Sequence, residues 1–195
     1  MVDMRSCSLW MLAVAAMLAM TAAVAQDNQI TEVPLVNASF DEGMDEAGVP
    51  VGWTKYSGGG VDQTLELVEV DEGTALVISD GDPGAEVGVS QDFPITGGEN
   101  YRVTVRVRKV GATSAGGSYL QFRFSPSQEF EQTSLAAQSP DDFNEIALYG
   151  TPPEGDTSAR IYLYCHAGPT PKVMVDNVKV EAGVEPPPPP PPPPP

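Results

Sequence analysis

The sequence predicts an all-β fold, specifically a single-domain antiparallel β-sandwich of the jelly-roll type. Short segments alternate apolar and polar residues, and Gly, Pro, Asp and Asn separate them. No window of about 12 residues or more in the mature part of the chain shows a helical period. Strands of this kind form antiparallel sheets that bury one face each, and two such sheets packed together make a sandwich.

Tyr101–Arg108 is the strongest predicted strand, because apolar and polar residues alternate over its whole length. Its arginines, including Arg102 and Arg106, point away from the apolar side. In chain order the predicted strands are Leu65–Val70, Thr74–Ile78, Glu86–Gln91, Tyr101–Arg108, Ser118–Phe124, Asn144–Tyr149, Arg160–His166 and Lys172–Val180.

The two ends of the chain predict segments outside the sandwich. Residues 1–25 read as a cleaved signal peptide, with the small residues Ala23 and Ala25 before the expected cleavage site; an uncleaved anchor is the alternative. We expect a polar lead-in at 26–33, the sandwich at 34–183 and a polyproline tail at 184–195. The tail is either an extended spacer or a low-complexity end. The mature protein is therefore expected to be secreted, either extracellular, periplasmic or on the cell surface.

Charge restricts the partners. The chain has 10 Lys and Arg against 27 Asp and Glu, a net charge of −17. Such acidity disfavours nucleic acid and anionic lipid, so we expect neither nucleic-acid binding nor membrane association after signal cleavage. It suits uncharged ligands and calcium, or serves solubility alone. Cys7 lies in the predicted leader, so Cys165 has no intrachain partner and is interpreted as a small buried hydrophobe.

Four short motifs occur in order along the predicted domain: Asn-Ala-Ser-Phe-Asp at 37–41, Pro-Val-Gly-Trp at 50–53, Gly-Thr-Ala-Leu at 73–76, and Asp-Asn at 176–177. Together they resemble the carbohydrate-binding modules of families four, nine and twenty-two. These are galactose-binding-like β-sandwiches that bind xylan or glucan and accompany polysaccharide hydrolases. The chain departs from that pattern at Asp41, which replaces a glutamate, at Asn177, which replaces an aspartate, and in the spacing from Gly73 to Ala75, which is one residue short.

The resemblance implies one structural Ca²⁺ where the first and last strands meet. Carried over to this sequence, the carboxylates are Asp41 and Asp176, with backbone carbonyls near Ser39, Asp71 and Thr74. Ca²⁺ binds six to eight oxygens of this mixed kind. The alternative is that the two aspartates only cap strand ends.

Strand alternation predicts a ligand-binding face. Outward side chains on two strands are aromatic, amide or cationic, and tyrosine rings stack on sugar rings while amides and guanidinium groups donate to hydroxyls. The predicted ligand-binding residues are Tyr119, Gln121, Arg123, Tyr162, Tyr164, His166 and Arg106. The alternative is that exposed tyrosines only pack across the strands. Binding at the loop end would instead use Tyr56, Phe130 or Tyr149. Trp53 is expected to plug the core, with ligand contact as its alternative.

Three functions follow as hypotheses. The first is a secreted, monomeric, non-catalytic module that binds a neutral polysaccharide such as xylan or β-glucan. The second is a structural or adhesive ectodomain built on the same sandwich. The third is a small polysaccharide hydrolase, which would need two catalytic carboxylates from acidic turns such as Asp41-Glu42 or Asp45-Glu46.

Overall fold

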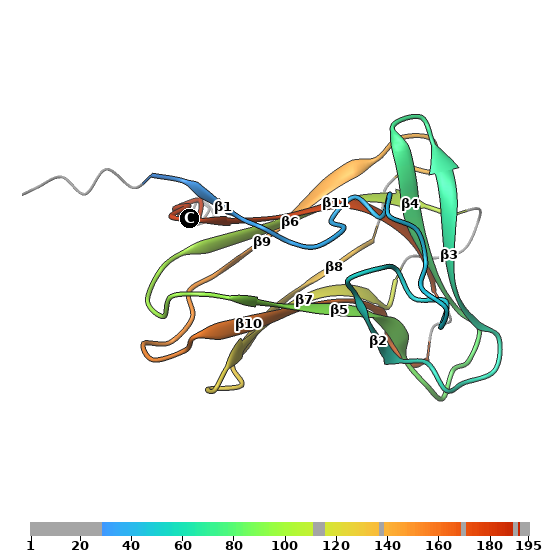
Figure 1. The fold of residues 1–195 in the computed structure, drawn as a ribbon, viewed down its shortest axis with the longest axis horizontal. Coiled ribbons are helices and arrows are strands. Elements are labelled where there is room, and N and C mark those ends of the chain that lie inside the picture. The colour runs from blue at the N-terminus through green and yellow to red at the C-terminus, as the bar shows by residue number, and fades with distance from the viewer. Residues whose placement is uncertain (1–28, 111–115, 137–138, 169–170, 189–190, 192–195) are drawn as a thin grey trace, which may run out of the picture.

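The computed structural model describes residues 29–110, 116–136, 139–168, 171–188 and 191 (Figure 1). Within these ranges no helix is long and apolar enough to cross a membrane. The predicted signal peptide lies outside the described residues, and so does most of the proline run.

Two antiparallel sheets lie face to face (Figure 1). The first contains, in spatial order, β3 (Gln63–Val70), β4 (Gly73–Asp80), β11 (Lys172–Ala182), β6 (Tyr101–Lys109) and β9 (Asn144–Gly150), with β1 (Thr31–Val33) paired to β11. The second contains β2 (Thr54–Ser57), β5 (Val87–Pro94), β10 (Ser158–Cys165), β7 (Ser118–Ser125) and β8 (Phe130–Ser134). The predicted all-β antiparallel sandwich is confirmed.

The core forms where the apolar sides of the two sheets meet. Val103, Val105 and Val107 of β6 are fully buried, as are Leu120 and Phe122 of β7 on the opposing sheet. Burial of about 25 cal/mol per Å² of apolar surface is the main force that holds the layers together. Because one side of each strand is committed to this core, the other side is left to form an outer face.

The motifs of residues 34–53 build a plug between the sheets. Phe40 is fully buried and its ring lies 5.3 Å from that of Trp53. Asn37, at φ 49°, donates from Nδ2 to the carbonyl of Val51 at 3.0 Å, and its own carbonyl accepts from Trp53 Nε1 at 3.1 Å. Trp53 is 5% exposed, so it belongs to the core.

Three strands were not expected from the sequence: β1, β2 and β8. Each is short and lacks a clear apolar side, so its place depends on backbone pairing to a longer neighbour. β1 lies within the predicted lead-in of 26–33, where Thr31 to Val33 pair with Ala182 to Val180 of β11.

Cys165 is fully buried beside the Ser118 hydroxyl, with 3.4 Å between Sγ and Oγ. Burial raises the pKa of its thiol to about 12, so the reactive thiolate is not formed near neutral pH. The residue is the small buried hydrophobe that the sequence predicts.

Candidate functional site

The outer face of the second sheet gathers most of the aromatic and amide side chains predicted for ligand binding. β10 contributes Tyr162 and Tyr164, and β7 contributes Tyr119, Gln121 and Arg123, because alternate residues of these strands leave the core. The register pairs Tyr164 with Tyr119, Tyr162 with Gln121, and Arg160 with Arg123. We call this surface the tyrosine face; its residues are Tyr56, Tyr119, Gln121, Arg123, Phe130, Gln132, Arg160, Tyr162, Tyr164 and His166.

Tyr164 lies at the centre of a ring cluster. Its ring centroid is 5.4 Å from that of Tyr56, 5.7 Å from that of Tyr119 and 6.4 Å from that of His166. Tyr56 also meets Tyr162 edge to face, with 5.0 Å between centroids. Edge-to-face and tilted contacts at these separations are favourable, so the rings stabilise one another's positions.

Gly88 allows this cluster to form across β5. Both Tyr56 of β2 and Tyr164 of β10 pair with Gly88, which therefore lies between them on the sheet. A Cβ atom at residue 88 would lie 2.2 Å from the carbonyl oxygen of Leu163 and 2.6 Å from Cβ of Tyr164. With no side chain here, rings from two strands that are not neighbours can touch.

Hydrogen bonds fix the orientation of the polar groups. The Tyr56 hydroxyl donates to Glu86 Oε2 at 2.6 Å, and Glu86 Oε1 lies 2.5 Å from His166 Nδ1. Gln132 Oε1 accepts from the Tyr164 hydroxyl at 3.2 Å and from Gln121 Nε2 at 3.0 Å. These bonds restrict the rotamers of the face before any ligand arrives.

Burial raises the pKa of Tyr56 above its usual value, and the carboxylate of Glu86 adds to the rise. Burial likewise raises the pKa of Tyr164. Both phenols are therefore neutral at physiological pH, and the centre of the face offers ring edges and hydroxyls rather than phenolate charge.

Tyr164 is only 7% exposed, yet it lies outside the hydrophobic core. It is covered by the rings of Tyr56 and Tyr119 and by the bond to Gln132, all on the outer face. Tyr119 and Tyr162 are half-buried and more accessible. Tyr164 is therefore a support for the other rings, and Tyr119 and Tyr162 are the better placed to meet a ligand.

One end of the tyrosine face is hollowed into a depression of about 350 Å³. Arg160 lies there, and Asp92 accepts from its Nε and Nη2, both at 2.6 Å. Arg123 and Tyr162 form another part of the wall. The depression therefore combines a ring, a neutralised ion pair and a second guanidinium group.

The structure brings together all of the predicted ligand residues except Arg106. That residue points outward as expected, but β6 belongs to the other sheet, where Arg106 Nη1 binds Glu72 at 2.9 Å. The prediction that Arg106 joins the tyrosines is wrong, because alternation gives the side of a strand but not its sheet. Of the loop-end candidates, Tyr56 and Phe130 lie on the tyrosine face, whereas Tyr149 is on β9 of the other sheet.

Sequence analysis did not select Glu86, Gly88 or Gln132. Their roles depend on the register of β5 with β2 and β10, and of β8 with β7. A short polar strand such as β8 carries no periodic signal, so Gln132 could have been found only after β8 was recognised as a partner of β7.

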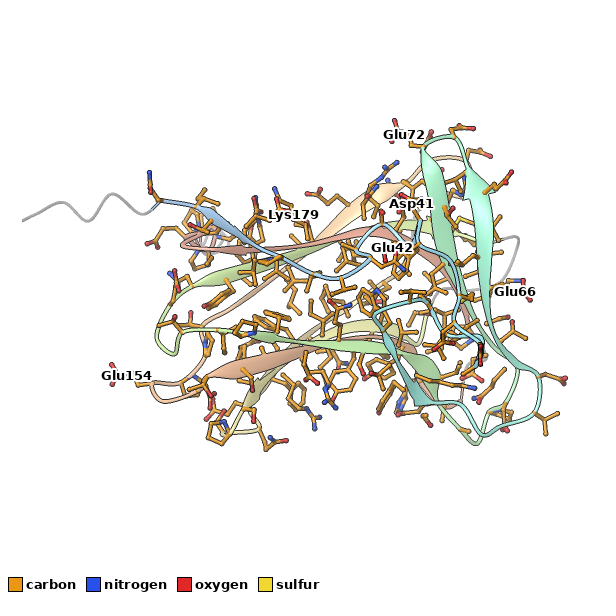
Figure 2. The ribbon with its side chains drawn as sticks, viewed as in Figure 1. Asp41, Glu42, Glu66, Glu72, Glu154 and Lys179 are labelled. Carbon is orange, nitrogen blue, oxygen red and sulfur yellow. The ribbon has the colours of Figure 1, made fainter. Side chains whose placement is uncertain are left out.

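The predicted calcium residues meet at one corner of the sandwich. In Figure 2 the labelled Asp41, Glu42 and Glu72 gather there, while Glu154 lies at the opposite end. Asp41 Oδ1 accepts from the backbone N–H of Thr74 at 2.8 Å. Within the described ranges no three carboxylate, histidine or cysteine side chains converge as metal ligands. An ion here would therefore depend on backbone carbonyls such as those of Ser39 and Asp71.

Asp176 is the most buried acid of this corner, at 1% exposure. It lies next to a bulge in β11 where Asn177 adopts φ 48°. Burial raises the pKa of Asp176, the nearby charges of Asp41 and Glu72 add to the rise, and Arg106 opposes it from 3.7 Å. The corner thus gathers the acids Asp41, Glu72 and Asp176 around Arg106, which pairs with the last two.

No protein-family model matches this chain, and no curated protein matches it in sequence. Its fold is similar to that of several solved structures. A cyclase from Fischerella sp. TAU aligns with a TM-score of 0.57 at 16% identity, over 78% of this chain and 97% of the cyclase. A family 16 carbohydrate-binding module aligns with a TM-score of 0.52 at 14% identity, over 75% of this chain and 97% of the module.

The enzymatically active domain of tailspike protein 4 from bacteriophage CBA120 aligns with a TM-score of 0.56 at 19% identity. The match covers 76% of this chain but only 21% of the tailspike chain, so the sandwich corresponds to about a fifth of that protein. At these identities the similarity establishes a shared β-sandwich and nothing finer. The chain has the fold of a carbohydrate-binding module, and a cyclase has that fold too.

Proposed function

We propose that this protein is a secreted, monomeric, non-catalytic carbohydrate-binding module that holds a polysaccharide across the tyrosine face. The observation that carries the proposal is the ring cluster of Tyr56, Tyr119, Tyr162 and Tyr164, braced across three strands with amides beside it. Aromatic surface flanked by hydroxyl and amide groups suits sugar rings, whose faces are apolar and whose edges carry hydroxyls.

The expected affinity is modest. Each ring contact contributes about 1 kcal/mol beyond area burial. A few contacts therefore correspond to dissociation constants from roughly micromolar to millimolar, about −8 to −4 kcal/mol. Xylan and β-glucan are the first ligands to examine, since the resemblance in the sequence motifs favours them.

The carboxylates of this face support a binding role over a hydrolytic one. Glu86 accepts a hydrogen bond from Tyr56 and contacts His166 Nδ1. Asp92 accepts hydrogen bonds from both Nε and Nη2 of Arg160. A glycosidase needs one carboxylic acid and one free carboxylate about 5–10 Å apart across the scissile bond. Groups already committed to neighbours are poorly suited to either task.

Retention on polysaccharides tests the proposal. The protein is passed over insoluble xylan, cellulose and mixed-linkage glucan, and run in native gels that contain soluble glycans, with calcium present throughout. We expect slowed migration with at least one glycan and release of no reducing sugar. Absence of retention on every glycan would overturn the proposal, and release of reducing sugar would replace it with the hydrolase.

Calcium is the second part of the proposal. Asp41 and Asp176 would hold the ion together with carbonyls near Ser39, Asp71 and Thr74, joining the plug, the β3–β4 hairpin and β11. Bound calcium would neutralise the acidic corner and stabilise the native state by RT ln(1 + [L]/Kd), about 2.7 kcal/mol at a hundredfold excess over Kd.

Thermal unfolding with and without a chelator tests the calcium site. We expect the wild-type Tm to rise in millimolar calcium and Asp41→Ala to abolish the rise. Glu154→Ala is the matched control, because Glu154 is an exposed acid at the opposite end of the molecule (Figure 2). If neither calcium nor chelator changes the Tm of the wild-type protein, the site does not exist.

A further inference from the structure

Arg123 lies at the edge of the tyrosine face between two aromatic rings. Its guanidinium carbon lies 5.4 Å from the ring centroid of Phe130 and 5.8 Å from that of Tyr162. Both contacts are of the cation–π kind, in which the ring face attracts the positive charge. The two rings therefore hold the guanidinium group in place without using its N–H donors.

The charge of Arg123 is not matched by an acid. Its cross-strand neighbour Arg160 is paired with Asp92 by two bonds of 2.6 Å, so Asp92 is already occupied. No ion pair of Arg123 occurs among the described residues, and its Nε is buried without a hydrogen-bond partner. In a chain with 27 acidic and 10 basic residues, an arginine left without an acid requires an explanation.

This unmatched group opens onto the depression of about 350 Å³. Ser125, Gln128 and Ser158 line the same hollow and add hydroxyl and amide groups to it. The volume is at the lower end of the range for small-ligand sites, roughly 300–1,000 Å³. The hollow therefore has a positive group without an acid, a ring, neutral hydrogen-bonding groups and the ion pair of Arg160 with Asp92.

We infer that Arg123 recognises the carboxylate of a uronic acid residue carried by the bound glycan. The inference rests on the proposed function and names the substrate class of the same face. A guanidinium group matches a carboxylate through two parallel N–H···O bonds. Phe130 and Tyr162 hold the guanidinium group in place, and the charge of Arg160 is already paired with Asp92.

The net charge of −17 limits how many carboxylates the ligand carries. A polymer with a carboxylate on every residue would be repelled by the molecule as a whole. A mostly neutral chain with uronic acid at intervals would not, because its neutral residues lie on the tyrosines while one carboxylate meets Arg123. The ligand class is therefore a sparsely uronylated neutral glycan.

Calorimetric titration with a matched pair of ligands tests the inference. The pair is an oligosaccharide of β-linked xylose bearing one glucuronic acid and the same compound with its carboxyl group reduced to an alcohol. We expect wild-type protein to bind the acid at least tenfold more tightly than the alcohol. Arg123→Gln should bind both forms equally, with near-ultraviolet circular dichroism showing that its rings stay packed.

Arg108→Gln is the control variant, because Arg108 lies over the ring of Phe143 at 4.8 Å on the other sheet. It should keep the tenfold preference. Equal binding of the acid and the alcohol by the wild type would overturn this inference and leave the proposed function standing. Binding of neither form, nor of any neutral glycan, would overturn both. Stronger binding of fully charged polygalacturonate would contradict the sparse-charge class.

Discussion

The outer faces of the two sheets differ in how many of their charged side chains are paired with one another. On the first sheet, Glu181 accepts from Arg102 Nε at 2.9 Å and from Lys179 Nζ at 2.8 Å. Arg106 binds Glu72 on the same side. We call these residues the ion-pair face. On the tyrosine face, rings replace most of the charges, and Arg123 has no acid.

This difference is the reason for placing the proposed ligand on the tyrosine face. Charged groups of the ion-pair face already satisfy one another, so a neutral polymer would gain little there. The tyrosine face exposes ring surface beside oriented donors, which favours release of water when a sugar chain covers it. Substitutions in the core and on each face test this contrast between the two faces.

Replacing Trp53 with alanine should have the largest effect, because this ring packs in the core on Phe40 and anchors residue 37 through its Nε1. Loss of a buried aromatic side chain costs about 3–5 kcal/mol of unfolding free energy. Urea unfolding measures it. A cost below about 1 kcal/mol, together with loss of glycan binding, would instead make Trp53 a ligand contact and break the contrast.

Gly88→Val should lower the free energy of unfolding and weaken glycan binding together. The new side chain would meet the backbone of Leu163 and separate Tyr56 from Tyr164, at a cost of about 1–3 kcal/mol. Gly59→Val is the control, since nothing lies within 4 Å of a Cβ at that position. If both variants unfold at the same urea concentration as the wild type, the close approach across β5 does not exist.

Tyr162→Ala should weaken glycan binding by about fivefold, the equivalent of about 1 kcal/mol for one ring, with a smaller effect on unfolding. Tyr149→Ala removes a half-buried tyrosine from the other sheet and should leave the affinity unchanged. Titration calorimetry measures the glycan affinity of both variants. Equal losses of affinity would mean that binding does not distinguish the two faces.

Glu181→Gln should have the smallest effect, about 1 kcal/mol or less at pH 7, because partly solvated ion pairs contribute little. Lys179 and then Arg102 lower the pKa of Glu181 below 4.5. The folded state then binds fewer protons, so the stabilisation is present above about pH 4.5 and is lost as the pH falls through the lowered pKa. Urea unfolding at pH 7 and at about pH 2 should show a difference only at pH 7. A difference of equal size at both values would exclude the charge as its cause.

The alternating strands could be predicted from the sequence because alternation reports burial directly. The outward positions of Tyr119, Gln121, Tyr162 and Tyr164 were predicted for the same reason. The sheet to which Arg106 belongs could not be, since long-range pairing leaves no mark on a single strand. The cover over Tyr164 and the role of Gly88 also required the register of β2, β5 and β10.

A residue-resolved titration tests the central contrast most directly. Amide chemical shifts of the ¹⁵N-labelled protein are followed while xylo-oligosaccharide and β-glucan oligosaccharide are added in turn, with calcium present. The account predicts that at least one ligand shifts signals from β5, β7 and β10, together with Tyr56, and leaves those of β6 and β11 in place. Shifts centred on Arg102, Arg106 and Lys179, or no shifts with either ligand, would contradict it.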